Sequence, residues 1–169
     1  MCSSDLDNEH WSIFEMVNVV MEIETTRDIG RQILRHRSFS FQEFSQRYAN
    51  PTDMGYAIRE ARLQDTKNRQ NSIETEDQEL KEKWEQYQRA YIESAFSMYK
   101  WAIENGIAKE QARCVLPEGM TMSRMYMSGS LRSWIHFTKL RMGNGTQKEH
   151  QDIANKCWNI LKERFEFLN

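Results

Sequence analysis

The residues best suited to chemistry in this sequence lie together in fourteen positions, from Arg35 to Tyr48. Three arginines, a histidine, a glutamate and three serines are interleaved there with aromatic side chains. An arginine guanidinium binds phosphate or carboxylate through two parallel hydrogen bonds. The formal net charge of the whole chain is only -2, so this positive cluster is local. We therefore expect a pocket for a planar, anionic, aromatic ligand rather than a general nucleic-acid surface.

Two predicted elements position this cluster. A helix is expected to begin after Thr26, a suitable N-cap, and to present Gln32, Arg35 and His36 at its carboxyl end. The period then changes to two, which predicts an extended segment up to Tyr48. Glu43, Ser45 and Arg47 would share one face of that segment, and Phe44, Gln46 and Tyr48 the other.

The rest of the chain predicts alternating strands and helices. Strands are expected at 14–24 and 120–129, with helices at 76–105, 108–116, 130–141 and 146–166. The long helix would bury Leu80, Trp84, Tyr87, Tyr91, Ala95, Met98 and Ile103, and Gly106 would end it. The helix at 130–141 would bury Leu131, Trp134, Ile135 and Phe137 or Thr138. The expected fold class is α+β: a single domain with an antiparallel sheet flanked by helices.

Composition narrows the class of protein. A chain of 169 residues with 39% hydrophobic and 28% charged residues is typical of one globular domain. Three cysteines without a CxxC spacing argue against a disulfide framework or a zinc site, and are typical of a reducing cytoplasm. No apolar run reaches the length of a membrane span, and neither a P-loop nor a G-x-G-x-x-G motif is found.

Several single residues have ordinary structural interpretations. Cys114 and Cys157 are expected to be buried small hydrophobes rather than nucleophiles. His150 is expected on the surface, whereas His10 and His136 could each be structural histidines. Residues 1–9 are predicted to be a non-native or disordered tail, with Cys2 to Leu6 either a translated sequencing-adapter remnant or simply disordered. Residues 10–169 would form the catalytic domain.

The cluster resembles the signature of the flavin-dependent thymidylate synthases: Arg-His-Arg, seven residues, then Ser-x-Arg-Tyr. The resemblance covers nearly the whole chain from His10, which stands 25 residues before Arg35, where the family has a histidine. "ARCVLP" at 112–117 is similar to the family's Ala-Arg-x-x-Leu-Pro, and the segments at 130–141 and 146–150 are similar to two further family motifs. The family's first strand and helix are absent before His10, which predicts an N-terminal truncation.

This resemblance implies an activity. The family converts dUMP to dTMP by reductive methylation, with methylenetetrahydrofolate as carbon donor, reduced FAD as hydride donor and NADPH as the reductant of the flavin. It uses no cysteine nucleophile. Family members are homotetramers whose active sites are shared between subunits. The expected location is the cytoplasm of a bacterium, or of a host cell if the gene belongs to a phage, and neither a nucleic-acid nor a membrane partner is expected.

The resemblance also implies site residues. Arg141 would be catalytic, because a cation beside the uracil ring favours the anionic form of the base. Contacts to dUMP are implied for Gln32, Arg35, Glu43, Phe44, Ser45, Gln46, Arg47, Arg113 and Arg141. Contacts to FAD are implied for His10, Ser12, Arg35, His36, Arg37, Glu43, Ser130, Arg132 and His136. The chain departs from the family at Gln42, Ser130 and His136, each of which replaces a usual asparagine.

Two other functions are compatible with these residues. A non-catalytic nucleotide or nucleic-acid binding module could stack bases on Phe39, Phe41, Phe44 and Tyr48. Such a module would bind oligonucleotides with a steep salt dependence and would carry no flavin. A degenerate family member with a purely structural role is the other alternative.

Overall fold

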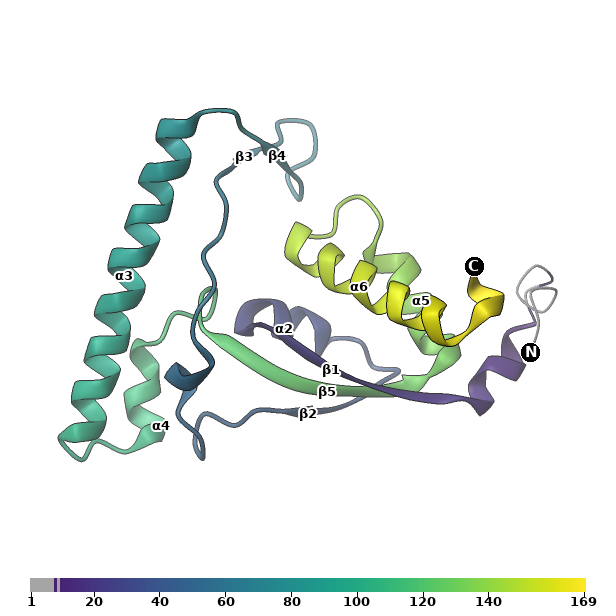
Figure 1. The fold of residues 1–169 in the computed structure, drawn as a ribbon, viewed down its shortest axis with the longest axis horizontal. Helices are drawn as coiled ribbons and strands as arrows, with labels where there is room; N and C mark the ends of the chain where they lie inside the picture. Colours follow the sequence, from purple (N-terminus) through teal and green to yellow (C-terminus); the bar gives the residue numbers. More distant parts are fainter. Residues whose placement is uncertain (1–7, 9) are drawn as a thin grey trace. The chain divides into compact units, whose positions relative to one another are not determined.

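The computed structural model describes residue 8 and residues 10–169, and the predicted tail at 1–9 lies outside the described residues except for Asn8. The helices and strands confirm the α+β class (Figure 1). In chain order the helices are η1 (Trp11–Met16), α2 (Arg27–Ile33), η2 (Pro51–Met54), α3 (Gln78–Glu104), α4 (Lys109–Ala112), η3 (Arg113–Val115), α5 (Leu131–Arg141), α6 (Lys148–Arg164) and η4 (Glu166–Leu168). The strands are β1 (Asn18–Thr26), β2 (Ser40–Glu43), β3 (Arg62–Gln64), β4 (Ser72–Glu74) and β5 (Met122–Ser130).

The strands form two small sheets. One has the order β1-β5-β2, and the other pairs β3 with β4 in antiparallel register, with Leu63 opposite Ile73. Strand β5 runs antiparallel to β2, because the N–H of Phe44 donates to the carbonyl oxygen of Arg124 while Phe39 lies against Gly129. The central strand therefore joins segments that are far apart in the sequence.

The chain divides into two compact units. The first holds the described residues up to Ile23, together with Gln32–Gln42 and Tyr126–Asn169. The second holds Glu24–Arg31 and Glu43–Met125. Each unit is described by itself below.

The core of the first unit is built on α5. Its predicted apolar stripe is confirmed, since Leu131, Trp134, Ile135, Phe137 and Thr138 are all fully buried. Ser130 caps the helix by accepting a hydrogen bond from the backbone N–H of Ser133. The Trp134 ring meets that of Phe39 edge-on, with 5.0 Å between centroids, and its indole N–H donates to the carbonyl oxygen of Val19. This packing fixes the orientation of α5.

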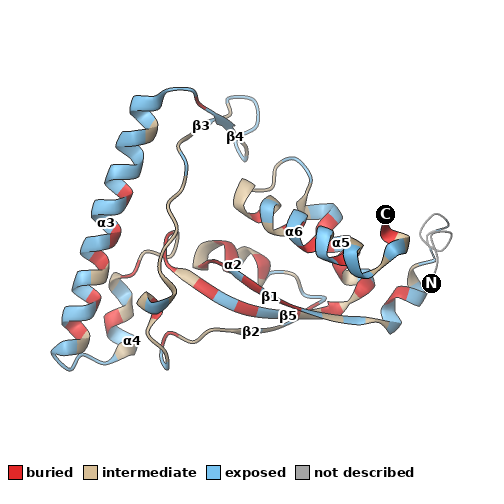
Figure 2. Cartoon of the chain, viewed as in Figure 1, coloured by how far each residue is buried: buried red, intermediate tan, exposed pale blue. Residues whose placement is uncertain are grey.

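The second unit is built around α3, and its buried face is not the predicted one. Gln88, Ile92, Ala95, Tyr99 and Ala102 are buried, and of the predicted face only Ala95 is among them. Leu80, Trp84, Tyr87, Tyr91 and Met98 are exposed instead, and Ile103 is partly buried (Figure 2). The helix boundaries agree with the prediction to within two residues, because Asp77 caps the start and Gly106 follows the end with a φ of 77°.

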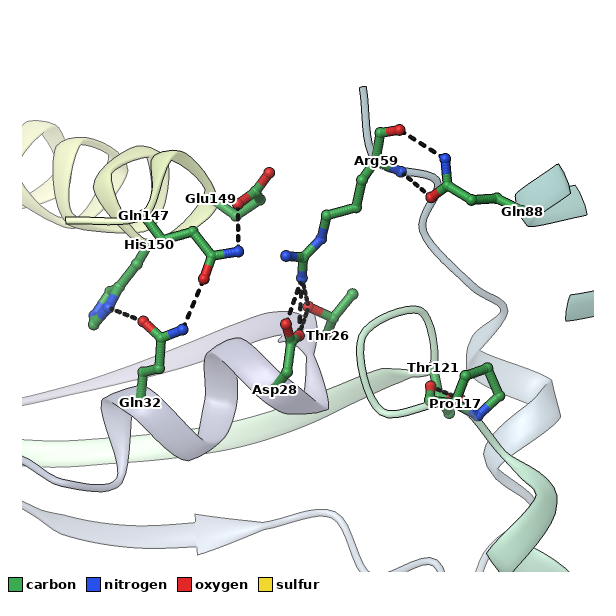
Figure 3. A network of polar contacts seen from close by, with 10 residues as sticks. All are labelled: Thr26, Asp28, Gln32, Arg59, Gln88, Pro117, Thr121, Gln147, Glu149 and His150. Atoms are coloured by element: carbon green, nitrogen blue, oxygen red, sulfur yellow. Dashed lines mark hydrogen bonds and ion pairs between the residues drawn. The ribbon is translucent and has the colours of Figure 1, made fainter. Parts of the chain in front are cut away.

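Within the second unit, two hydrogen bonds from a buried side chain of α3 hold the segment that precedes β3. The Gln88 amide accepts from the backbone N–H of Arg59 at 2.9 Å and donates to the carbonyl oxygen of the same residue at 2.8 Å (Figure 3). The Arg59 guanidinium in turn donates to both carboxylate oxygens of Asp28 and to the hydroxyl of Thr26. Arg59 therefore ties the start of α2 to the chain that leads to α3, a role that the sequence did not predict.

Two predicted boundaries near the N-terminus are wrong. The predicted strand at 14–24 begins only at Asn18, because Phe14 lies in the 3-10 helix η1 and stacks on the ring of Phe167. The helix that starts at Arg27 ends at Ile33, so Arg35 lies in the turn that follows rather than on a helix face. Among the described residues, no helix is long and apolar enough to cross a membrane.

Candidate functional site

In the first unit, the predicted catalytic arginine contacts a histidine that is predicted to bind FAD. Arg141 is the last residue of α5, and its Nε donates to Nε2 of His36 at 2.9 Å. Because a guanidinium cannot accept a hydrogen bond, His36 must be neutral, with its proton on Nδ1. Burial, together with the positive charge of Arg141 and the neighbouring His136, lowers the pKa of His36 to about 4. The contact thus uses only the inner nitrogen of Arg141.

A second histidine is buried beside this pair. His150, predicted on the surface, is fully buried in the first turn of α6, with its ring 5.8 Å from that of Phe137 and 6.3 Å from that of His36. Burial, together with the positive charge of Arg141 and the neighbouring His36, lowers its pKa to about 4. Its Nε2 has no hydrogen-bond partner among the described residues.

A chain of hydrogen bonds runs from His150 through Gln32. His150 Nδ1 lies 3.3 Å from Gln32 Oε1, and it must donate because an amide oxygen only accepts (Figure 3). Gln32 Nε2 donates to Gln147 Oε1 at 2.8 Å, and Gln147 Nε2 donates to Glu149 Oε2 at 2.8 Å. These contacts fix the orientation of the Gln32 amide and leave one N–H and one lone pair for a ligand.

The predicted flavin residues of α5 border an open cavity. This cavity has a volume of about 690 Å³, and Arg132 and His136 are among the residues that line it. Trp11, Glu15 and Lys139 also line it, although the sequence did not single them out. Lys139 Nζ lies 5.7 Å from the centre of the Trp11 ring, a cation–π contact that the sequence spacing could not reveal. Hydrogen bonds from Ser130 and Arg132 lower the pKa of the Glu15 carboxyl.

The predicted dUMP loop lies in the second unit and differs from its predicted shape. Strand β2 ends at Glu43, which accepts from the hydroxyl of Ser123 at 3.0 Å and from Arg27 at 3.3 Å. The extended conformation predicted beyond it is wrong, because the chain turns: the N–H groups of Tyr48 and Ala49 both donate to the carbonyl oxygen of Ser45. The alternating two-face arrangement therefore does not form.

Within that turn the side chains are held differently from one another. Gln46 is buried, and its Nε2 has no hydrogen-bond partner among the described residues. Arg47 is exposed and lies 3.4 Å from a carboxylate oxygen of Glu110. The Ser45 hydroxyl accepts from the backbone N–H of Arg47 at 3.4 Å, so it supports the turn.

Comparisons with known proteins show the family to which the chain belongs. The family model described as thymidylate synthase complementing protein matches residues 3–166. The chain is 52% identical over 156 residues to a flavin-dependent thymidylate synthase of Synechocystis sp., covering 92% of this chain and 71% of that protein. It is 47% identical over 158 residues to a probable flavin-dependent thymidylate synthase of Paramecium bursaria Chlorella virus 1, covering 94% and 72%. A flavin-dependent thymidylate synthase of Thermosipho africanus is 31% identical over 159 residues, covering 94% and 69%.

The chain belongs to the thymidylate synthase complementing protein family.

The arginines implied as site residues differ in whether a carboxylate pairs with them. Among the described residues, eight arginines are ion-paired with carboxylates: Arg27, Arg31, Arg47, Arg59, Arg62, Arg89, Arg124 and Arg132. Of the arginines that the resemblance implies as site residues, Arg47 and Arg132 are among these eight, whereas Arg35, Arg37, Arg113 and Arg141 form no ion pair with any described residue. Cations without counterions are available to an anionic ligand, so these four arginines could bind one without first breaking an ion pair.

The two cysteines among the described residues differ in burial. Cys157 is buried, as predicted, and burial raises the pKa of its thiol to about 12. Cys114 is exposed, so its predicted burial is wrong: it lies on the outer side of η3, while Ala112 and Leu116 take the buried positions on either side. Within residues 8 and 10–169, no group of three or more His, Cys, Asp or Glu side chains could hold a metal ion.

Proposed function

We propose that this protein catalyses the reductive methylation of dUMP to dTMP, with methylenetetrahydrofolate as carbon donor and NADPH as the reductant of a bound flavin. Its assignment as an enzyme of the methyltransferase class rests on relatives at 47% and 52% identity that are named flavin-dependent thymidylate synthases. The observation that carries the proposal is the set of unpaired arginines at family positions, Arg35, Arg37, Arg113 and Arg141. The two ligands whose contacts are proposed, dUMP and FAD, both carry phosphate, and an unpaired guanidinium binds phosphate well.

Arg141 would act on the base of the nucleotide. Its Nε is held by His36, so its two terminal nitrogens are free to donate to a uracil carbonyl. A fixed positive charge there favours the anionic form of the base and so makes its ring carbon a better nucleophile. Neutral His36 adds no second charge that would repel the arginine, and in this way it orients Arg141 at little electrostatic cost.

The remaining nucleotide contacts are proposed from the family positions. Gln32, with its amide already oriented, would contact the base or sugar, while Arg35, Arg113 and Arg47 would bind phosphate. The turn residues Glu43, Phe44, Ser45 and Gln46 would complete the nucleotide site. Arg47 would have to exchange its contact with Glu110 for the phosphate. That exchange is inexpensive, because an exposed ion pair contributes only about 0–1 kcal/mol.

The residues beside α5 fit a flavin. Trp11 lines the cavity with an indole ring that a flavin would stack on in place of Lys139, and Arg132 would exchange its ion pair with Glu15 for a diphosphate. Flavin contacts are proposed for His10, Ser12, Arg35, His36, Arg37, Glu43, Ser130, Arg132 and His136. FAD, when bound and reduced, supplies the hydride of the reaction. We also propose that the enzyme works in the cytoplasm as a homotetramer with shared sites.

Replacing Arg141 tests the proposed chemistry. Arg141→Lys keeps the charge but loses the planar fork, so dTMP formation should fall by about a hundredfold or more while FAD binding persists. Arg164→Lys, an exposed arginine at the end of α6, is the matched control and should keep full activity. Near-normal turnover in Arg141→Lys would remove Arg141 from the mechanism.

The visible spectrum separates this function from a nucleotide-binding module without catalysis. An enzyme of this class should show a bound-flavin spectrum that dUMP perturbs. A colourless protein that takes up no added FAD but binds oligonucleotides with steep salt dependence would support the binding module instead.

A further inference from the structure

One face of α3 carries a row of large apolar side chains that the described residues leave exposed. Leu80, Trp84, Tyr87, Tyr91, Met98 and Trp101 have exposed fractions between 39% and 61%. The helix buries a different face, made of Gln88, Ile92, Ala95, Tyr99 and Ala102. Figure 2 shows exposed residues along most of the length of α3. We call the row, together with Ser94, the α3 seam.

The spacing of the α3 seam is that of a helix–helix contact. Its positions are 80, 84, 87, 91, 94, 98 and 101, so steps of four and three residues alternate without a break. This 3.5-residue period is the pattern with which one helix packs along another, side chains of each filling gaps in the other. The seam runs for about 30 Å, since each helical residue rises about 1.5 Å. A surface of this length and period fits another long helix.

We propose that the α3 seam is a self-association surface that pairs with α3 of a second copy of this chain in antiparallel orientation. The seam is complementary to itself: when Trp84 faces Trp101 of the second copy, Tyr87 faces Met98 and Tyr91 faces the small Ser94. The same register sets Lys83 opposite Glu104 of the second copy, so opposite charges flank the seam at both ends. The symmetry of such a pair makes every contact occur twice.

The area that the seam offers is sufficient for a specific interface. A fully covered aromatic side chain buries roughly 150–250 Å². Six side chains that are about half exposed offer on the order of 100 Å² each, so a pair would bury on the order of 1,200 Å², the lower bound for stable interfaces. Trp and Tyr are also the residues that contribute most to binding energy when they lie at the centre of an interface.

This proposal deepens the proposed homotetramer by naming one of its surfaces, but it rests on α3 alone. A tetramer with dihedral symmetry has more than one kind of two-fold contact. Loss of the seam should therefore leave a smaller assembly held by the other contact.

The test is the mass of variants in solution, measured by sedimentation velocity on the full chain at micromolar concentration. Tyr91→Glu and, independently, Tyr87→Glu place a charge in the seam and should weaken association by about tenfold or more, halving the mass or reducing it further. Gln86→Glu adds the same charge at an exposed position of the same helix outside the seam, and it should keep the wild-type mass. Circular dichroism should show unchanged helix content in all three variants, since each position is exposed.

A wild-type protein that is monomeric under these conditions overturns the proposal. So does a wild-type mass that persists in both tyrosine variants, or an equal loss in Gln86→Glu. If the wild-type protein forms dTMP and both tyrosine variants have the wild-type mass, the proposal for the α3 seam is overturned and the proposed activity stands.

Discussion

The buried ring of His150 should make the stability of this protein fall as the pH falls. In the folded chain the ring lies against Phe137 and His36, near the cation of Arg141, and its pKa is lowered from 6.5 to about 4. In the unfolded chain the same ring takes up a proton near its ordinary pKa of 6.5. Between these two values the unfolded state binds more protons, so acid shifts the equilibrium toward it. Above about pH 6.5 the ring is neutral in both states and has no effect.

The size of this effect follows from the two pKa values. At about pH 5, the protonation of the unfolded ring lowers the free energy of unfolding by about 2 kcal/mol relative to about pH 7.5. The full difference applies because the side chain is completely buried. His36 acts in the same direction, but it is present in both proteins of the comparison below and so cancels.

Urea unfolding at about pH 7.5 and about pH 5, followed by tryptophan fluorescence, measures the loss directly. The variant His150→Leu replaces the ring with an apolar side chain and should lose about 2 kcal/mol less on acidification than the wild type. His10→Leu, at an exposed position before η1, is the control and should behave as the wild type. If His150→Leu loses as much stability as the wild type, His150 is not held neutral by its surroundings, and the account of its pKa is refuted.

Three further substitutions test the packing. Gly129→Ala should cost about 1–3 kcal/mol, because the new methyl group would stand 2.5 Å from a ring carbon of Phe39; an unchanged urea midpoint would contradict this contact. Gln88→Met removes both hydrogen bonds to the backbone of Arg59 and should also cost about 1–3 kcal/mol, measured in the same way; a neutral result would mean that these two bonds contribute nothing. Tyr99→Phe removes a buried hydroxyl that has no partner among the described residues, so the thermal midpoint should stay the same or rise; a clear fall would reveal a partner for that hydroxyl.

The sequence predicts those parts of the fold that depend on local signals. Helix α5 has both of them, a capping serine at Ser130 and apolar residues at helical spacing, and its buried face was predicted correctly. The site residues were predicted by a motif whose spacing specifies residue types. That motif does not specify the backbone, which is why the turn at Ser45 was missed: its hydrogen bonds, and not the alternation of side chains, decide the conformation.

The errors share a cause, which is that burial depends on contacts between distant segments. His150 is buried because Gln32 and Phe137 receive it, and nothing in the residues around His150 indicates this. The face of α3 was misjudged because the helix carries two candidate faces. The aromatic one is more hydrophobic, but the face with Gln88 is the one that the second unit covers.

Because Arg141 contacts a neutral His36, the protein should respond to the anions in the solution. A guanidinium whose hydrogen-bond partner is neutral has its charge balanced by mobile ions alone, and within the described residues no carboxylate takes their place. Inorganic phosphate and other small anions in a buffer should therefore compete with the nucleotide for this position. The apparent affinity for dUMP should fall as such anions are added, and the unliganded protein should melt at a higher temperature in phosphate than in a buffer of equal ionic strength whose anions bind poorly.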